Sequence, residues 1–189
     1  MLGSLEKFNK LVDALEALPT IGKKTAIRVA YHLVMRDNYL GVKIAHAIED
    51  ALRNITKCEQ CGAMSENELC NICVDDARDA TTLCIVQSAK EIILFEENSL
   101  FNGKYFVLES VDEDAIHNLQ QIVSNGVEEI VFALTPSIQN EAMMLYIEDQ
   151  LQMYSVTFTK IAQGVPTGVN LENIDILSLT RALQDRVRV

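Results

Sequence analysis

Four cysteines in two pairs constrain this chain more than any other feature of its sequence. The first pair is Cys58-x2-Cys61, and eight residues later the second pair, Cys70-x2-Cys73, repeats the spacing. Two such pairs around a short loop allow four thiolates to converge on one tetrahedral cation, and zinc suits sulfur ligands. Gly62 suits the tight turn that follows the first pair. Because four protein ligands leave no position for a reactive water, we expect one structural zinc ion that stabilises its module by about 10 kcal/mol.

Other roles for these thiols stay open from the spacing alone. The pairs can form two disulfides or two redox centres, and another thiol-bound metal such as iron is a further alternative. The cysteine count is five, an odd number, and the first residues lack the features of a signal peptide, so we expect no disulfide framework and a cytoplasmic location. No run approaches 18 apolar residues, which argues against a membrane span. Cys84 stands in an apolar strand pattern and is expected to be a core residue rather than a fifth ligand.

Apolar residues at helical spacing predict three helices in the first 55 residues. They are expected at residues 5–18, 23–35 and 40–54. Pro19 ends the first helix, and the short turn at residues 20–22 makes the first two helices a tight hairpin.

Beyond residue 80, short β-branched apolar runs alternate with helical patterns. Strands are expected at residues 83–86, 105–108, 130–134 and 156–159, and helices at residues 88–97, 112–124 and 137–153. This alternation predicts an α/β domain with a largely parallel sheet. The fold class is therefore multidomain, α + α/β. We expect a helical domain over 1–55, a four-cysteine module over 56–78, the α/β domain over 79–165, and a C-terminal segment over 166–189 with a helix near 178–184.

The hairpin turn and the start of the second helix carry residues that suit contact with phosphate. Gly22 permits close approach of the main chain, and the helix N-terminus offers free amides with a positive dipole. Lys23, Lys24 and Arg28 stand at this end, with the last two on one helical face. Such a site holds a nucleic-acid backbone without reading bases. From these residues alone, an ordinary helical corner with solvated cations is an equal alternative.

The charge distribution indicates where nucleic acid can bind. The net charge is −11. Residues 1–57 hold nine Lys or Arg and six Asp or Glu, a balance of +3, whereas residues 58–189 hold seven and 21, a balance of −14. Because clustered cations drive phosphate binding, we expect DNA contact within the first 57 residues and basic protein partners on the acidic remainder.

These motifs resemble those of the RecR family of recombination mediators in both order and spacing. The resemblance runs through essentially the whole chain and rests on six segments: Leu18–Leu33, Cys58–Cys73, Leu83–Val86, Thr135–Ala142, Lys160–Glu172 and Leu179–Leu183. The family usually has Gly-x-Gly in the hairpin turn, whereas this sequence has Thr20 in place of the first glycine and Lys23 where proline is frequent. Lys24 and Arg28 match the basic positions with which the family contacts DNA.

The resemblance implies that residues 79–165 form a Toprim domain, a fold whose catalytic members hold Mg²⁺ with acidic residues after two strands. Here the neutral Gln87 follows the first strand, and a neutral run ending at Asn140 follows the third, so that only Glu141 is acidic nearby. Neutral amides bind Mg²⁺ weakly. We therefore expect no enzymatic activity and a surface for partner proteins, with Glu141 as a candidate contact. A Mg²⁺-dependent Toprim nuclease or nicking enzyme that uses Glu141 is the alternative.

The resemblance also implies a role in DNA repair and recombination. RecR-like proteins form ring-like homo-oligomers, commonly tetramers, that encircle DNA. With RecO, and sometimes RecF, they help to load the RecA recombinase onto strands coated by single-strand binding protein. We expect this chain to be such a non-enzymatic mediator, with one structural zinc per chain and no membrane partner. An adaptor that binds only proteins is a simpler hypothesis.

Overall fold

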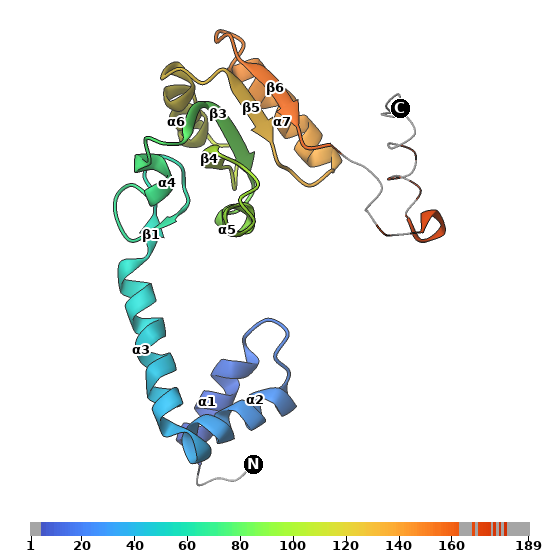
Figure 1. Ribbon diagram of the computed structural model, residues 1–189. Helices are drawn as coiled ribbons and strands as arrows, with labels where there is room; N and C mark the ends of the chain where they lie inside the picture. The colour runs from blue at the N-terminus through green and yellow to red at the C-terminus, as the bar shows by residue number, and fades with distance from the viewer. Residues whose placement is uncertain are drawn as a thin grey trace. The chain divides into compact units, whose positions relative to one another are not determined.

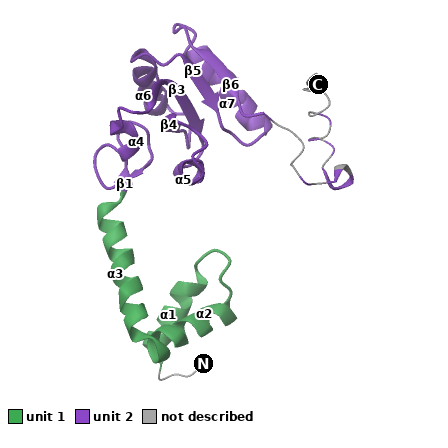
Figure 2. Ribbon diagram, in the orientation of Figure 1, with its two compact units in different colours: residues 1–55 green, residues 56–189 purple. Residues whose placement is uncertain are grey.

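The computed structural model describes residues 5–162 and, further along the chain, residues 168, 170–174, 176, 178 and 180. The protein divides into two compact units, Met1–Ile55 and Thr56–Val189 (Figure 2). Most of the expected helix near 178–184 lies outside the described residues, and so do residues 163–167 and 169 of the Lys160–Glu172 segment. No helix in the described part of the chain is long and apolar enough to cross a membrane.

The first unit opens with the expected helical hairpin. Helix α1 covers Glu6–Glu16 and helix α2 covers Lys23–Tyr31. Val12, Ala26 and Ala30 are buried where the two helices meet. The two alanines have small side chains, which lets the helices pack closely. Partly buried apolar side chains surround this core: Phe8, Leu11, Leu15 and Ile21.

A π-helical turn, His32–Arg36, joins α2 to helix α3, which covers Asn38–Asn54. The sequence predicted regular helix through this turn, but the chain widens, and the Asp37 amide donates to the His32 carbonyl over 2.8 Å. Asp37 also caps α3, because its Oδ1 accepts a hydrogen bond from the Leu40 amide over 2.8 Å.

Large apolar side chains of α3 are exposed. Tyr39 is 81% exposed and Leu52 is 79% exposed, and Val42, Ile44 and Ile48 are exposed as well. No residue of α3 is buried. Ile44, Ile48 and Leu52 follow one another at four-residue spacing and so share one face of the helix. Exposed apolar side chains in this number are typical of a surface that another protein chain covers.

The second unit begins with the four-cysteine module. Two short strands, β1 (Thr56–Lys57) and β2 (Met64–Ser65), pair antiparallel. A short helix, α4 (Asn71–Val74), follows them. These elements have few buried apolar residues apart from the cysteines, so the module depends on its metal and on the neighbouring sheet for stability.

A parallel sheet forms the body of the second unit (Figure 1). Its strands are β3 (Asp79–Val86), β4 (Gly103–Val107), β5 (Glu129–Phe132) and β6 (Thr157–Lys160). They lie in the order β4-β3-β5-β6, and all three pairings are parallel. The α + α/β fold expected from the sequence is therefore confirmed. Strands β4 and β6 are the edge strands of this sheet.

Helices make the crossover connections that parallel strands require. They are α5 (Ala89–Glu97), α6 (Glu113–Ser124) and α7 (Ile138–Gln150). Each begins after a residue whose side chain caps the first turn: Ser88, Asp112 and Ser137. A short 3₁₀ turn, Leu171–Asn173, is described in the C-terminal segment.

Alternate residues of β3 contribute to two cores, one on each face of the sheet. Leu83 and Ile85 belong to a core with residues of α6 and α7. Cys84 and Val86 belong to a second core with α5 and the four-cysteine module. The alternation reflects the two-residue period of side chains along a strand. Cys84 is thus a core residue, as the sequence predicted.

Candidate zinc centre and DNA-binding hairpin

The four paired cysteines come together in the second unit. One ligand atom from each of Cys58, Cys61, Cys70 and Cys73 lies within 4.8 Å of the others. The Sγ atoms of Cys61 and Cys70 are 3.5 Å apart, and those of Cys58 and Cys73 are 3.8 Å apart. These distances are far longer than a disulfide bond, and all four residues are free thiols. The pairs therefore form one cluster with the donor atoms that a structural metal needs.

Main-chain geometry shapes the first pair. Gly62 has a left-handed φ of 75° directly after Cys61, a conformation that glycine adopts at little cost. Its amide donates to the Cys58 carbonyl over 2.9 Å, and the Cys58 amide donates to the Ala63 carbonyl over 2.7 Å. The turn expected at Gly62 is present.

The second pair is joined to the first by a hydrogen bond to sulfur. Cys70 precedes α4 and Cys73 lies within it, where the Cys73 amide donates to the Cys70 carbonyl over 3.0 Å. The Cys70 amide donates to Sγ of Cys58 over 3.3 Å. An amide directed at sulfur stabilises the thiolate form that binds a metal.

Burial and hydrogen bonds shift the pKa values of three of the four cysteines. Burial raises the pKa of Cys58, but hydrogen bonds from the amides of Cys61 and Cys70 outweigh it and lower the pKa to about 7. A hydrogen bond with Cys73 and burial raise the pKa of Cys61, and burial raises that of Cys70. Four adjacent thiolates thus need a dication to balance their charge, and four converging sulfurs fit Zn²⁺ with no open coordination position.

In the first unit, the hairpin turn has one strained and one relaxed residue. Thr20 has a φ of 68°, in the left-handed region that β-branched residues rarely adopt. Gly22 is extended, with φ −86° and ψ 165°. The carbonyl of Gly22 accepts hydrogen bonds from the amides of Thr25 and Ala26 and so begins α2. The turn therefore places its unfavourable conformation on Thr20 and leaves Gly22 unstrained.

The residues expected to contact phosphate lie together at the start of α2. Gly22, Lys23, Lys24 and Arg28 are exposed, whereas Ala26 between them is buried. The first turn of α2 has no acidic residue and no side-chain cap, so its first amides can bind an anion. Among the described residues, no atom lies within 4 Å of a Cβ built on Gly22. The arrangement suits contact with a phosphate backbone.

At the carboxyl ends of β3 and β5, the two neutral amides noted in the sequence, Gln87 and Asn140, lie together. Gln87 Nε2 donates to Asn140 Oδ1 over 3.1 Å, and Asn140 Nδ2 donates to the Thr135 carbonyl over 2.6 Å. The carboxylate of Glu91 accepts hydrogen bonds from the amides of Gln87 and Ser88, so it serves as a helix cap. The side chains at this edge thus bind one another.

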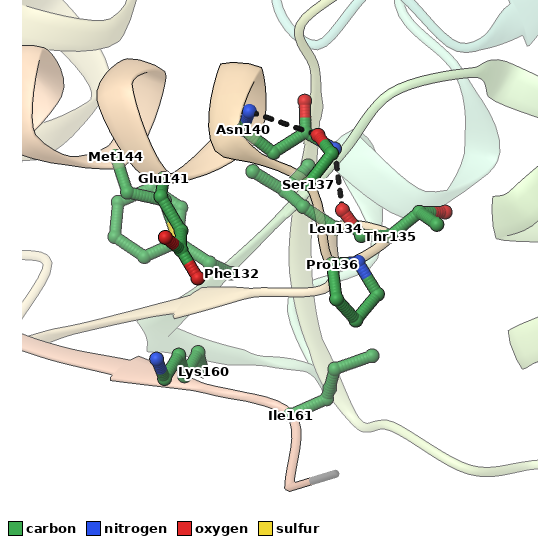
Figure 3. Close-up of a pocket in the computed structure, with 10 residues that line it drawn as sticks. All are labelled: Phe132, Leu134, Thr135, Pro136, Ser137, Asn140, Glu141, Met144, Lys160 and Ile161. Atoms are coloured by element: carbon green, nitrogen blue, oxygen red, sulfur yellow. Dashed lines mark hydrogen bonds between the residues drawn. The ribbon is translucent and has the colours of Figure 1, made fainter. Parts of the chain in front are cut away.

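Glu141 is exposed in the first turn of α7. It lines a hollow together with Phe132, Met144 and, on β6, Lys160 (Figure 3). Glu141 belongs to the second unit, whereas the hairpin residues belong to the first.

Known proteins match this chain over its whole length. The family model described as RecR, helix-hairpin-helix matches residues 8–52, and the RecR model for a zinc finger domain with four cysteines matches residues 55–75. A Recombination protein RecR from a Nitratiruptor species is 55% identical over 190 residues, which is 100% of both chains. The chain belongs to the RecR family. Proteins of the same name from Campylobacter jejuni subsp. jejuni, 51% identical over 100% of both chains, and Helicobacter pylori (strain Shi470), 47% identical over 98% of this chain and 96% of the relative, agree.

Membership of the RecR family indicates the broad role of the chain. The relatives are named recombination proteins rather than enzymes, so this RecR protein has a role in recombination and repair. Its helix-hairpin-helix segment supports an interaction with DNA. The match to the zinc finger domain and the cluster of four thiols together establish one structural zinc.

Two contacts of this RecR chain were not predicted from its sequence. The Gln87–Asn140 hydrogen bond joins residues 53 positions apart. Lys104 of β4 donates hydrogen bonds to the carbonyls of three residues in and beside α4. Neither contact has a local sequence signal, because each depends on how distant strands and loops meet.

Proposed function

We propose that this chain is a non-enzymatic mediator of recombination that holds the DNA backbone through its helical hairpin. The observation that carries the proposal is the exposed group of Gly22, Lys23, Lys24 and Arg28 at the uncapped N-terminus of α2. Amides and cations in this arrangement hold phosphates without reading bases. Binding should therefore be nonspecific in sequence and should weaken as salt rises.

The same proposal includes a ring-like homo-oligomer, with a tetramer as the expected form. One basic hairpin on a chain of net charge −11 holds DNA weakly, whereas several hairpins around one DNA raise the effective concentration of binding sites. The exposed apolar side chains of α3, among them Ile44, Ile48 and Leu52 on one face, support an assembly, because another chain would remove them from water.

The partners we propose are RecO and possibly RecF, with which the ring helps to load RecA onto DNA coated by single-strand binding protein. Family membership supports this, and so does the balance of −14 over residues 58–189, which favours basic surfaces of partner proteins. Glu141 is the candidate contact, because it is exposed beside a hollow. The cytoplasm is the proposed location, since reducing conditions keep thiols available for zinc.

The absence of enzymatic activity is proposed from the amides at the sheet edge. Mg²⁺ prefers carboxylate ligands, whereas Gln87 and Asn140 are neutral and bind each other. Glu91 is nearby but caps α5.

The domain boundaries of the proposal follow the ends of the elements. We propose a helical domain over 1–55, the zinc module over 56–78, a Toprim-like α/β domain over 79–165 and a C-terminal segment over 166–189. Helix α3 ends at Asn54, β3 begins at Asp79 and β6 ends at Lys160.

Substitution of the hairpin cations tests the DNA contact. Lys24→Ala combined with Arg28→Ala removes two cations, and the control, Lys90→Ala combined with Lys160→Ala, removes two exposed cations of the second unit. Fluorescence anisotropy with a labelled oligonucleotide measures affinity over a series of salt concentrations. If each cation contacts a phosphate, the slope of log affinity against log salt should fall by about two in the hairpin variant and stay unchanged in the control. If the hairpin variant keeps its circular dichroism and shows the affinity and slope of the wild type, the hairpin is not the DNA contact.

A further inference from the structure

Lys104 of β4 makes a contact that neither the recombination role nor the set of zinc ligands explains. Its Nζ donates hydrogen bonds to three main-chain carbonyls: Ile72 at 2.8 Å, Cys73 at 3.2 Å and Asp75 at 2.7 Å. A lysine ammonium has three hydrogens, so all of its donors are used. The three carbonyls lie in and directly after α4, the helix that begins after Cys70 and contains Cys73.

Within the described part of the chain, the charge of Lys104 is not paired with an acid. Among the described residues, no carboxylate oxygen lies within 4.0 Å of its Nζ. The ammonium instead binds the end of a helix, where the last carbonyls have no partner within the helix. Four thiolates around one dication keep an excess of negative charge. A cation held at the main chain of Cys73 therefore favours the metal-loaded state over the empty one.

The first cysteine pair is attached to the same strand. The amide of Val107 donates to the Cys61 carbonyl over 2.8 Å. A Cβ built on Gly62 would lie only 3.2 Å from Cβ of Val107, so the turn of the first pair packs directly against β4. Because β4 is an edge strand, its second side is available to the zinc module.

We propose that Lys104 is a positioning residue for the zinc centre. It binds the carbonyls around the second cysteine pair and so holds Cys70 and Cys73 in register with the first pair, which Val107 holds. Strand β4 is thereby the scaffold on which both pairs are aligned. Lys104 acts through the main chain and its charge, without being a ligand, and its effect is to slow the release of zinc.

Zinc release from the full-length, zinc-loaded protein into an excess of a chromogenic chelator tests this role. Lys104→Met keeps the apolar stem and removes the ammonium, and we expect release about tenfold faster, at the lower end of the range for residues that orient metal ligands. Lys104→Arg keeps the charge, but a planar guanidinium cannot direct three hydrogens at the same three carbonyls. Its release rate should lie between those of the wild type and Lys104→Met. Lys90→Met, an exposed position on α5, is the matched control and should match the wild type.

A second control separates positioning from a general loss of stability. Ile130→Val shortens a fully buried side chain in the same sheet and should lower stability by about 1 kcal/mol. The absorption bands of the Co²⁺-loaded protein report whether four thiolates still bind the metal in each variant. The proposal is overturned if Lys104→Met releases zinc no faster than Ile130→Val, or if Lys104→Arg is as fast as Lys104→Met. If Lys104→Met does not fold, the test rests on Lys104→Arg. Zinc release from that variant at the wild-type rate would then overturn the proposal.

Discussion

Gln87 and Asn140 are joined side chain to side chain, by a hydrogen bond of 3.1 Å across the carboxyl ends of β3 and β5. The carboxyl edge of a parallel sheet is where α/β proteins bind ligands. Here that edge holds two neutral groups that satisfy each other, and Asn140 also donates to the Thr135 carbonyl. The contribution of this pairing to stability can be tested directly.

Asn140→Asp should lower the free energy of unfolding by about 1–3 kcal/mol, because a carboxylate cannot donate to the Thr135 carbonyl and is costly to bury. Urea denaturation measures the loss. Gln139→Glu, at the exposed neighbouring position, adds the same charge and should change stability by less than about 0.5 kcal/mol. Equal losses in the two variants would contradict the role given to Asn140.

Gln87→Glu combined with Asn140→Asp should create a site that responds to Mg²⁺. Two carboxylates then meet at the sheet edge, and a divalent cation relieves their repulsion. We expect millimolar Mg²⁺ to raise the Tm of this double variant and to leave the Tm of the wild type unchanged. If Mg²⁺ instead raises the Tm of the wild type and not that of the double variant, the wild-type protein binds the metal despite its neutral amides.

Thr20→Gly should stabilise the first unit by about 1 kcal/mol. Thr20 has a φ of 68°, which costs a β-branched residue free energy and costs glycine almost none. Thermal unfolding followed by far-UV circular dichroism measures the gain. Thr25→Gly, inside α2, is the matched control and should be destabilising by roughly 0.3–0.5 kcal/mol, because glycine is a poorer helix former than threonine. A loss of stability in both variants would show that the turn does not strain Thr20.

Gly22→Ala should weaken DNA binding without changing stability. The extended conformation of Gly22 suits alanine, and the added Cβ meets no described atom within 4 Å, so the fold tolerates it. A methyl group at this point keeps a phosphate from approaching the first amides of α2. Anisotropy titrations and urea denaturation measure the two effects. Full DNA affinity in Gly22→Ala would mean that DNA does not approach the turn closely.

Zinc binding to the metal-free folded chain should release about one more proton at pH 6 than at pH 8. The pKa of Cys58 is lowered to about 7, so its thiol is largely ionised at pH 8 and largely protonated at pH 6. Since zinc binds thiolates, zinc affinity should also fall as pH falls through this range. Isothermal titration calorimetry in buffers of different ionisation enthalpy counts the protons. A proton count that is the same at both pH values would refute the assignment to Cys58.

Features with local sequence signals could be predicted. The helices and strands follow from apolar periodicity within short windows, and capping residues such as Ser137 and stops such as Pro19 mark several of their ends. The metal cluster follows from cysteine spacing alone, because two short pairs already restrict where four sulfurs can lie. The exposure of Lys24 and Arg28 follows from their helical spacing opposite the buried alanines.

Features that depend on contacts between distant segments could not be predicted. Arg78 forms an ion pair with Glu96, and the Tyr105 hydroxyl donates to the same carboxylate over 2.7 Å, so that three elements meet at one acid. The residues give no sign of this in the sequence, where Glu96 stands beside another acid in a helix. The left-handed conformation of Thr20 likewise runs against the preference of a β-branched residue, so the residue type does not predict it.

The attachment of both cysteine pairs to β4 sets an order of events while the protein is being made. Val107 lies 34 residues after Cys73, which at 5–20 residues per second corresponds to roughly 2–7 s of translation. During this interval all four cysteines have been synthesised, but the strand that aligns them has not. Zinc captured by the nascent chain is then held by the cysteines alone. We therefore expect retention of the metal to develop in two stages: capture by the four cysteines first, and attachment of the cysteine module to β4 afterwards.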